Sequence, residues 1–261
     1  MNKNEKEMIE VLKILKEEYG VIEIKAEFEA EGSRMEELMR LKDVTSSANL
    51  PIILKIGGSE AVTDIYNGII LGVEGLVAPM VETPYSVSKY LEVIQNLIQS
   101  DNRENIEFAI NIETITALNN IKEIMELPNI SLLSSVTFGR SDFVQSCGMK
   151  KSEVNSNKVL EHVRTVAIEA KKKNLKFAMG GNITTQSIDF VKHLYTEDLI
   201  SKYETRKVVF RSDFIDKNPI DGINMALKFE LLWLKSKQRF YSKIKEEDDH
   251  RILDLEKRLK N

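Results

Sequence analysis

Hydrophobic residues recur along this chain in two patterns that alternate, one typical of strands and one typical of helices. Short apolar runs that end at glycine, acidic or other turn-forming residues predict strands, and apolar residues spaced three or four positions apart predict helices. The predicted strands are residues 21–29, 51–56, 75–80, 106–113, a run ending at 139, 175–179 and 207–210. The predicted helices are residues 6–18, 33–47, 59–71, 83–98, a segment after 113, 155–173, 184–193, 219–240 and 246–259.

Strands that alternate with helices predict parallel β/α units, and 261 residues suit one TIM (β/α)8-type barrel. Only seven strands are apparent where a closed barrel needs eight. We expect an incomplete or modified first strand, a missed strand, or an element from a neighbouring subunit in the gap. Residues 1–218 are predicted to form the catalytic barrel domain. Residues 219–261 are predicted to form C-terminal helices that pack on the barrel or on a neighbouring subunit, which makes a homo-oligomer the expected assembly.

Composition narrows the class of protein. The net charge of −4 gives no basic excess for nucleic acid, and no apolar run approaches the length that spans a membrane. A single cysteine, Cys147, excludes an intramolecular disulfide and suits a reducing compartment. We expect a soluble, cytoplasmic protein whose partner is a small-molecule substrate.

Two acidic residues stand at the ends of consecutive predicted strands, Glu113 and Asp142. Because parallel strands end at one edge of a sheet, both carboxylates should meet where α/β proteins bind ligands. Carboxylate oxygens are the ligands that Mg²⁺ prefers. These residues therefore predict a site for Mg²⁺, or for Mn²⁺ or Co²⁺, although helix capping or pairing with lysine would also explain them.

The segment Gly139-Arg140-Ser141 leads into Asp142 and a predicted helix, so its backbone N–H groups could hold a carboxylate or phosphate oxygen. Arg140 could add a charge-assisted contact, or could be a surface residue of a tight turn.

Lys55 ends a short apolar strand and has three possible roles. It could hold a substrate carboxylate, pair with Glu27, Glu29 or Glu113, or form a Schiff base if its pKa is lowered. Glu27 and Glu29 share one face of a strand, and either could act as a base or could simply be solvated.

Three pieces of the sequence together resemble the HpcH/HpaI aldolase and citrate lyase β-subunit family. They are Leu76-Val77-Ala78-Pro79-Met80-Val81-Glu82-Thr83, then Asn111-Ile112-Glu113-Thr114 with Ala117-Leu118-Asn119-Asn120, then Phe138-Gly139-Arg140-Ser141-Asp142-Phe143. The resemblance implies an oligomeric, pyruvate-type TIM barrel that uses a divalent ion to make or break a carbon–carbon bond beside a 2-oxo acid. It also implies that Glu113 and Asp142 are the metal ligands.

Two positions depart from the pattern of that family. Ala30 stands where family aldolases carry a histidine that takes part in acid–base chemistry, and Lys55 stands where they carry an arginine that binds the substrate carboxylate. We expect a metal-dependent lyase or aldolase that works through a metal-stabilised enolate. The alternatives are a citrate-lyase-like enzyme acting on acyl-CoA, and a non-catalytic barrel that retains metal or ligand binding.

Overall fold

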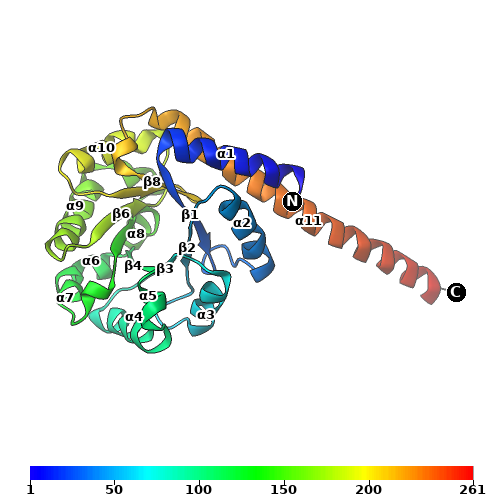
Figure 1. Ribbon diagram of the computed structural model, residues 1–261, viewed down its shortest axis with the longest axis horizontal. Helices are drawn as coiled ribbons and strands as arrows, with labels where there is room; N and C mark the ends of the chain where they lie inside the picture. The colour runs from blue at the N-terminus through cyan, green and yellow to red at the C-terminus, as the bar shows by residue number, and fades with distance from the viewer. Residues whose placement is uncertain (261) are drawn as a thin grey trace.

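A computed structural model describes residues 1–260 as a closed barrel of eight strands surrounded by helices (Figure 1). The strands are β1 (Val21–Glu27), β2 (Ile52–Lys55), β3 (Gly75–Ala78), β4 (Glu107–Ile112), β5 (Ser135–Gly139), β6 (Lys176–Gly180), β7 (Lys202–Glu204) and β8 (Val208–Arg211). The α-helices are α1 (Lys3–Tyr19), α2 (Met35–Ser47), α3 (Val62–Leu71), α4 (Pro84–Leu97), α5 (Ser100–Arg103), α6 (Ile115–Asn119), α7 (Ile121–Met125), α8 (Arg140–Ser146), α9 (Asn157–Lys172), α10 (Ile188–Thr196) and α11 (Pro219–Leu259). Short 3₁₀ helices are η1 (Ile130–Leu132), η2 (Lys151–Asn155), η3 (Thr185–Ser187) and η4 (Ser212–Phe214).

The predicted barrel is confirmed, but the missing strand is not the first one. β1 is complete and pairs with β2 on one side and with β8 on the other. The strand absent from the sequence prediction is β7, which forms an antiparallel hairpin with β8. Strands β1 to β7 run parallel and β8 runs against both of its neighbours. The β7–β8 turn therefore lies at the same end of the barrel as the C-terminal ends of the parallel strands.

Local signals fix where the helices begin and end. At the start of α1, the Asn2 side chain accepts a hydrogen bond from the Glu5 N–H at 3.1 Å, and the Glu5 carboxylate accepts one from the Asn2 N–H at 2.7 Å. These reciprocal bonds satisfy backbone donors that have no partner within the helix. The helix ends at Gly20, whose positive φ of 69° is open to glycine at little cost.

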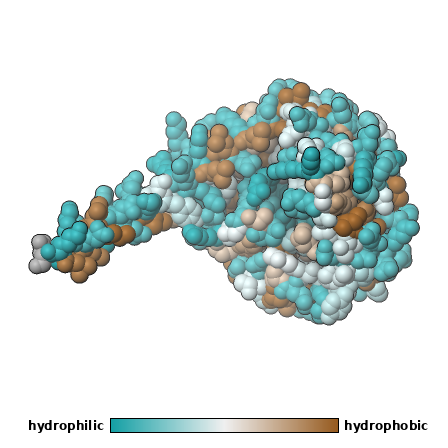
Figure 2. Space-filling model, turned by 180° about the vertical axis from the view of Figure 1, so that it is seen from behind, coloured by the Kyte–Doolittle hydropathy of each residue, from teal (hydrophilic) through white to brown (hydrophobic). Residues whose placement is uncertain are grey.

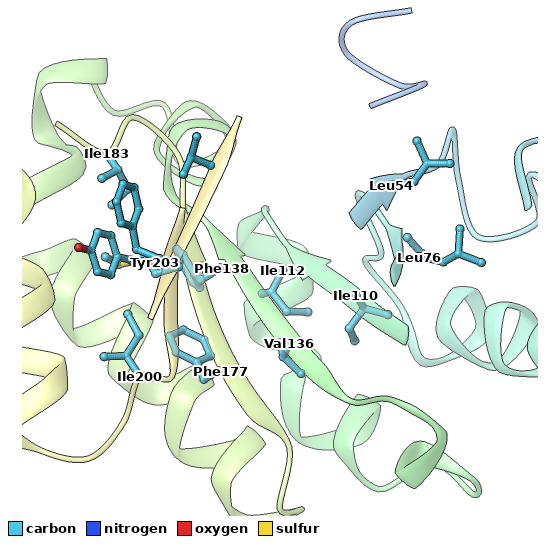
Figure 3. Packing of buried hydrophobic residues seen from close by; sticks show 14 of the residues in the cluster. Leu54, Leu76, Ile110, Ile112, Val136, Phe138, Phe177, Ile183, Ile200 and Tyr203 are labelled. Atoms are coloured by element: carbon cyan, nitrogen blue, oxygen red, sulfur yellow. The ribbon is translucent and has the colours of Figure 1, made fainter. Parts of the chain in front are cut away.

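The hydrophobic core lies between the outer face of the barrel and the surrounding helices. Its strand residues alternate along each strand, as Ile24 and Ala26 do on β1. Figure 3 shows part of this layer, from Leu54 on β2 to Tyr203 on β7. Burial of this continuous apolar layer is the main term that stabilises the barrel.

The inner face of the barrel is charged. Lys202 on β7 donates to Glu23 on β1 at 2.6 Å and to Glu107 on β4 at 2.7 Å. Lys25 on β1 donates to Glu204 on β7 at 2.6 Å. A cavity of only about 30 Å³ remains, and apolar side chains such as Ile53, Val77 and Val209 line it beside these ion pairs.

The C-terminal region forms one helix where the sequence predicted two. The first part of α11 packs against α1, while its distal part extends away from the barrel (Figure 1). The helix begins at Pro219, next to the predicted domain boundary, and the independence of residues 1–218 stays a prediction. Within residues 1–260, no helix is long and apolar enough to cross a lipid bilayer.

Candidate active site

A cavity of about 440 Å³ opens at the C-terminal ends of the parallel strands. Side chains from β1, β2, β4 and α8 meet there, together with the β7–β8 turn. Of the predicted site residues, those that line the cavity are Glu27, Glu29, Lys55, Glu113, Gly139, Ser141 and Asp142. Residues far apart in sequence are therefore gathered at the edge that the strand pattern indicated.

Glu113 follows β4 and is only 4% exposed. Its carboxylate accepts hydrogen bonds from the Asn111 side-chain amide at 3.0 Å and from the Met80 backbone N–H at 3.1 Å. Met80 has a positive φ of 51°, a conformation that non-glycine residues rarely adopt. Burial raises the pKa of Glu113, as does the nearby Asp142 carboxylate, while Lys55 and the Met80 N–H act in the opposite direction.

Asp142 lies in the first turn of α8, where it is exposed. Within residues 1–260, neither a hydrogen bond nor an ion pair to its carboxylate is formed. Nearby, the Asn111 Oδ1 atom is buried without a hydrogen-bond donor in the described chain. The site thus presents a buried carboxylate, a free carboxylate and an unsatisfied oxygen, a donor set that suits a hard divalent cation.

The protein offers only part of a coordination shell. No group of three or more His, Cys, Asp or Glu side chains in residues 1–260 is arranged to hold a metal ion. Two carboxylates suit Mg²⁺, which is commonly held by one or two carboxylates and keeps several water molecules. The residues present therefore fit a hydrated ion that is completed by substrate or water.

Glycine is required where β5 meets α8. A Cβ atom on Gly139 would lie 2.6 Å from the Glu113 carboxylate, closer than Cβ atoms come to other heavy atoms. A Cβ atom on Gly181, after β6, would lie 2.4 Å from the Ser141 backbone nitrogen. The two glycines let β4, β6 and α8 approach one another closely enough to form the cavity wall.

Lys55 lies between two acidic residues of β1 and its following turn. Its Nζ is 2.9 Å from Glu29 Oε2 and 3.7 Å from Glu27 Oε1. Burial alone would lower the pKa of Lys55, but the charges of Glu27, Glu113 and Glu29 outweigh it and raise that pKa. The structure shows Lys55 paired with carboxylates, and its raised pKa does not favour a Schiff base, while its contact with a substrate carboxylate stays a prediction.

Arg140 is the predicted substrate contact that the structure contradicts. Its side chain is fully buried, and all five guanidinium N–H groups are used within the protein. They donate to the Gly180, Gly181 and Val154 carbonyls, to Asn155 Oδ1 and to Ser187 Oγ, at 2.6 to 3.3 Å. The guanidinium also lies over the Phe190 ring, 4.9 Å from its centroid. No guanidinium N–H is therefore left to bind a substrate carboxylate. The side chain instead connects α8 to β6 and η2.

Several polar residues of the site were not predicted from the sequence. Lys25, Asn111, Thr137 and Glu204 line the same cavity. The signal was the alternation of charged and apolar residues along β1, where Glu23, Lys25 and Glu27 share one face. In a barrel that face points inward, which the strand alone does not reveal.

Residues 52–182, about half of the chain, match the family model described as HpcH/HpaI aldolase/citrate lyase. The chain belongs to this family. As a member of the HpcH/HpaI family it is an enzyme of the lyase class. The matched segment contains Lys55, Glu113, Gly139 and Asp142, whereas β1 and the β7–β8 hairpin lie outside it.

Solved structures with low sequence identity share the fold of this HpcH/HpaI family member. The citrate synthase SbnG is 16% identical, with a TM-score of 0.61 over 76% of this chain and 81% of that one. An HpcH/HpaI aldolase from Desulfitobacterium hafniense DCB-2 is 14% identical, with a TM-score of 0.61 over the same shares. Macrophomate synthase is 14% identical, with a TM-score of 0.56 over 89% of this chain and 82% of that one. No curated protein sequence matches the chain significantly.

Proposed function

We propose that this lyase makes or breaks a carbon–carbon bond beside a 2-oxo acid, with a divalent cation held by Glu113 and Asp142. The observation that carries the proposal is the pair of carboxylates at neighbouring strand ends, one buried and neither paired with a cationic side chain of residues 1–260. An ionised carboxylate in such a place is costly unless a positive charge accompanies it. When bound, Mg²⁺, Mn²⁺ or Co²⁺ would act as a Lewis acid that polarises the substrate carbonyl.

The residues around the two carboxylates would bind the substrate carboxylate and transfer the proton. The Lys55 ammonium, fixed by Glu27 and Glu29, would attract the substrate carboxylate, and the backbone and hydroxyl at Gly139 and Ser141 would contact it from the other side of the cavity. Ala30 lines the cavity where family aldolases carry a histidine, so another group must move the proton.

Glu27 and Glu29 are the two candidates for that proton transfer. Burial would raise the pKa of Glu27, but Lys25 and Lys55 outweigh it and hold the pKa of this carboxyl below its usual value. A carboxylate with a lowered pKa is a weak base. We assign the proton transfer to Glu29 on geometry, because its side chain is 32% exposed at the rim of the cavity, against 5% for Glu27.

Substitution of Glu113 tests the proposal. Glu113→Gln keeps the shape of the side chain but removes the charge, so both Mn²⁺ binding and turnover should be lost. Mn²⁺ binding would be measured by calorimetry, and turnover by a screen of 2-oxo acids with aldehydes in the presence of Mg²⁺, Mn²⁺ or Co²⁺. Glu82→Gln is the matched control, because Glu82 follows β3 but does not line the cavity. Full activity of Glu113→Gln would refute the proposal.

A second candidate function is a lyase that acts on an acyl-CoA thioester. Lys151 and Arg206 line the same cavity and would suit the phosphates of a nucleotide, while Ile183 and Leu227 give it an apolar wall. Stabilisation of the protein by acyl-CoA, but not by pyruvate or oxalate, in a thermal-shift experiment would favour this candidate.

A further inference from the structure

One face of α11 carries two apolar groups separated by a polar stretch. The first group is Leu227, Leu231 and Leu234, each 51–52% exposed, and the second is Ile252, Leu255 and Leu259, 42–87% exposed. The six residues belong to one series of positions spaced alternately four and three residues apart. Between the two apolar groups, the same series contains Gln238, Tyr241, Lys245 and Asp248. Such a series is the heptad repeat with which two helices pair.

The distal part of α11 has no partner of its own. Every residue from Ser242 to Lys260 is exposed, and Figure 2 shows apolar side chains along the projecting helix. Most helical stability in proteins comes from packing an apolar face, and this part of the helix packs against nothing in the described chain. The apolar series therefore indicates a surface that is buried in an assembly.

We propose that α11 pairs with α11 of a second copy of this chain in an antiparallel arrangement, with the two-fold axis beside Lys243. Leu227 then faces Leu259 of the second copy, Leu231 faces Leu255, and Leu234 faces Ile252. Every apolar residue of one group meets one of the other group, and Gln238 and Tyr241 face Asp248 and Lys245. This is the self-complementary contact that a two-fold axis requires.

Charges beside the apolar series support the same register. In this arrangement Lys228 lies beside Glu256 of the second copy, Glu230 beside Arg258, and Lys235 beside Asp249. Opposite charges at these flanking positions favour a given partner and orientation. The one like-charged pair is Lys237 with Arg251. Lys237 is already paired with Glu37 at 3.0 Å, and Lys228 is likewise paired with Glu7 at 2.9 Å, so Lys228 would be shared between Glu7 and Glu256. Ile244 meets its own counterpart near the axis.

A parallel arrangement is disfavoured by the polar middle of the helix. It would place Lys245 against Lys245 and Asp248 against Asp248 in the core of the pair, where like charges are destabilising. The antiparallel arrangement avoids both contacts.

The pairing would also complete the wall of the active-site cavity. Leu227 and Glu230 of α11 line that cavity. Their facing residues, Leu259 and Arg258 of the second copy, would therefore lie at its rim. The second copy would supply an apolar and a basic side chain to each site.

Light scattering of the full chain tests the pairing. The protein should have the mass of an even-numbered oligomer, and Leu255→Asp should at least halve that mass. Leu253→Asp is the matched control, because Leu253 is 52% exposed but lies on the opposite face of the helix. A monomeric wild-type chain, or equal dissociation by both variants, would overturn the proposal. Circular dichroism should show that Leu255→Asp loses helix content while the barrel still unfolds cooperatively.

Disulfide formation tests the orientation. In a Cys147→Ser background, which has no other cysteine, Leu231→Cys and Leu255→Cys would be oxidised separately and as a mixture. The antiparallel register separates the two copies of either residue by roughly 36 Å along the axis but brings Leu231 against Leu255. Only the mixture should give a covalent dimer. Covalent dimers from either variant alone would establish a parallel pair and overturn the proposed register.

Discussion

Arg140 shows how the same residue type takes opposite roles in different surroundings. After a strand and a glycine it has the sequence context of a ligand-binding arginine. In the fold its guanidinium has five acceptors inside the protein, contributed by the end of β6, by η2 and by η3. The acceptors are mostly backbone carbonyls, which no sequence pattern identifies.

The buried role of Arg140 predicts a stability effect. Arg140→Met should lower the free energy of unfolding by about 3 kcal/mol or more, because several buried carbonyl groups lose their donors. Urea denaturation would measure it. Arg239→Met, an exposed arginine, serves as the control and should change stability little. Equal stability of the two variants would contradict the structural role.

Glu27 predicts a pH dependence of stability. Its pKa is held below the usual value in the folded protein, so its ionised form stabilises the fold above the pKa of the unfolded state. That contribution is lost as the pH falls through the lower, folded pKa. Glu27→Gln should therefore be destabilising at pH 7 and should approach wild-type stability as the pH falls below about 4. Thermal unfolding of both proteins across this pH range would measure the difference in stability. A stability difference that grows as the pH falls would contradict the prediction.

At the scale of elements, the turn from β5 into α8 sets the geometry of the candidate metal site. Gly139 ends β5 against the Glu113 side chain, and the chain then enters α8 with Asp142 in its first turn. The sequence predicted this strand-to-helix turn with Asp142, and it predicted Glu113 at the end of the preceding strand. It did not predict that the glycine is needed by Glu113 rather than by a ligand.

Gly139→Ala tests this close packing. The added methyl group should displace the Glu113 carboxylate, so Mn²⁺ affinity and turnover should fall at least tenfold while the barrel remains folded. Gly58→Ala is the matched control, because a Cβ atom at Gly58 meets open space after another strand. The expected outcome is near-wild-type binding for Gly58→Ala, and wild-type binding by Gly139→Ala would refute the argument.

At the scale of the whole molecule, ion pairs across the inside connect distant strands of the barrel. Lys202 on β7 bonds to Glu23 on β1 and to Glu107 on β4, and it is only 7% exposed. Burial alone would lower the pKa of Lys202, but these two carboxylates outweigh it and raise that pKa. The hairpin that closes the barrel is therefore held by charge as well as by backbone pairing.

Replacing Lys202 should show how strongly an unpaired buried carboxylate destabilises the barrel. Lys202→Met should destabilise the protein by about 3 kcal/mol, because it leaves the buried Glu23 without a cationic partner, whereas the more exposed Glu107 keeps Lys176 at 3.2 Å. Adding Glu23→Gln should recover part of the loss, since the unpaired charge is then absent. Chemical denaturation of the single and double variants would measure both effects. A double variant less stable than the single one would show that the network is not the cause.

The sequence by itself determined most of the strands and helices, the barrel class and the two acids at the ends of consecutive strands. These follow from local periodicity and from residues that end strands, which depend little on distant contacts, while the family follows from the resemblance of three sequence pieces. The structure alone showed β7, because Lys202-Tyr203-Glu204 is short and its charged residues face the barrel interior, so no apolar run marks it. It also determined that Arg140 is enclosed, that Lys55 is shared between Glu27 and Glu29, and that Lys25, Asn111 and Glu204 join the cavity. Each of these depends on which strands become neighbours when the barrel closes, and that arrangement is a property of the whole chain.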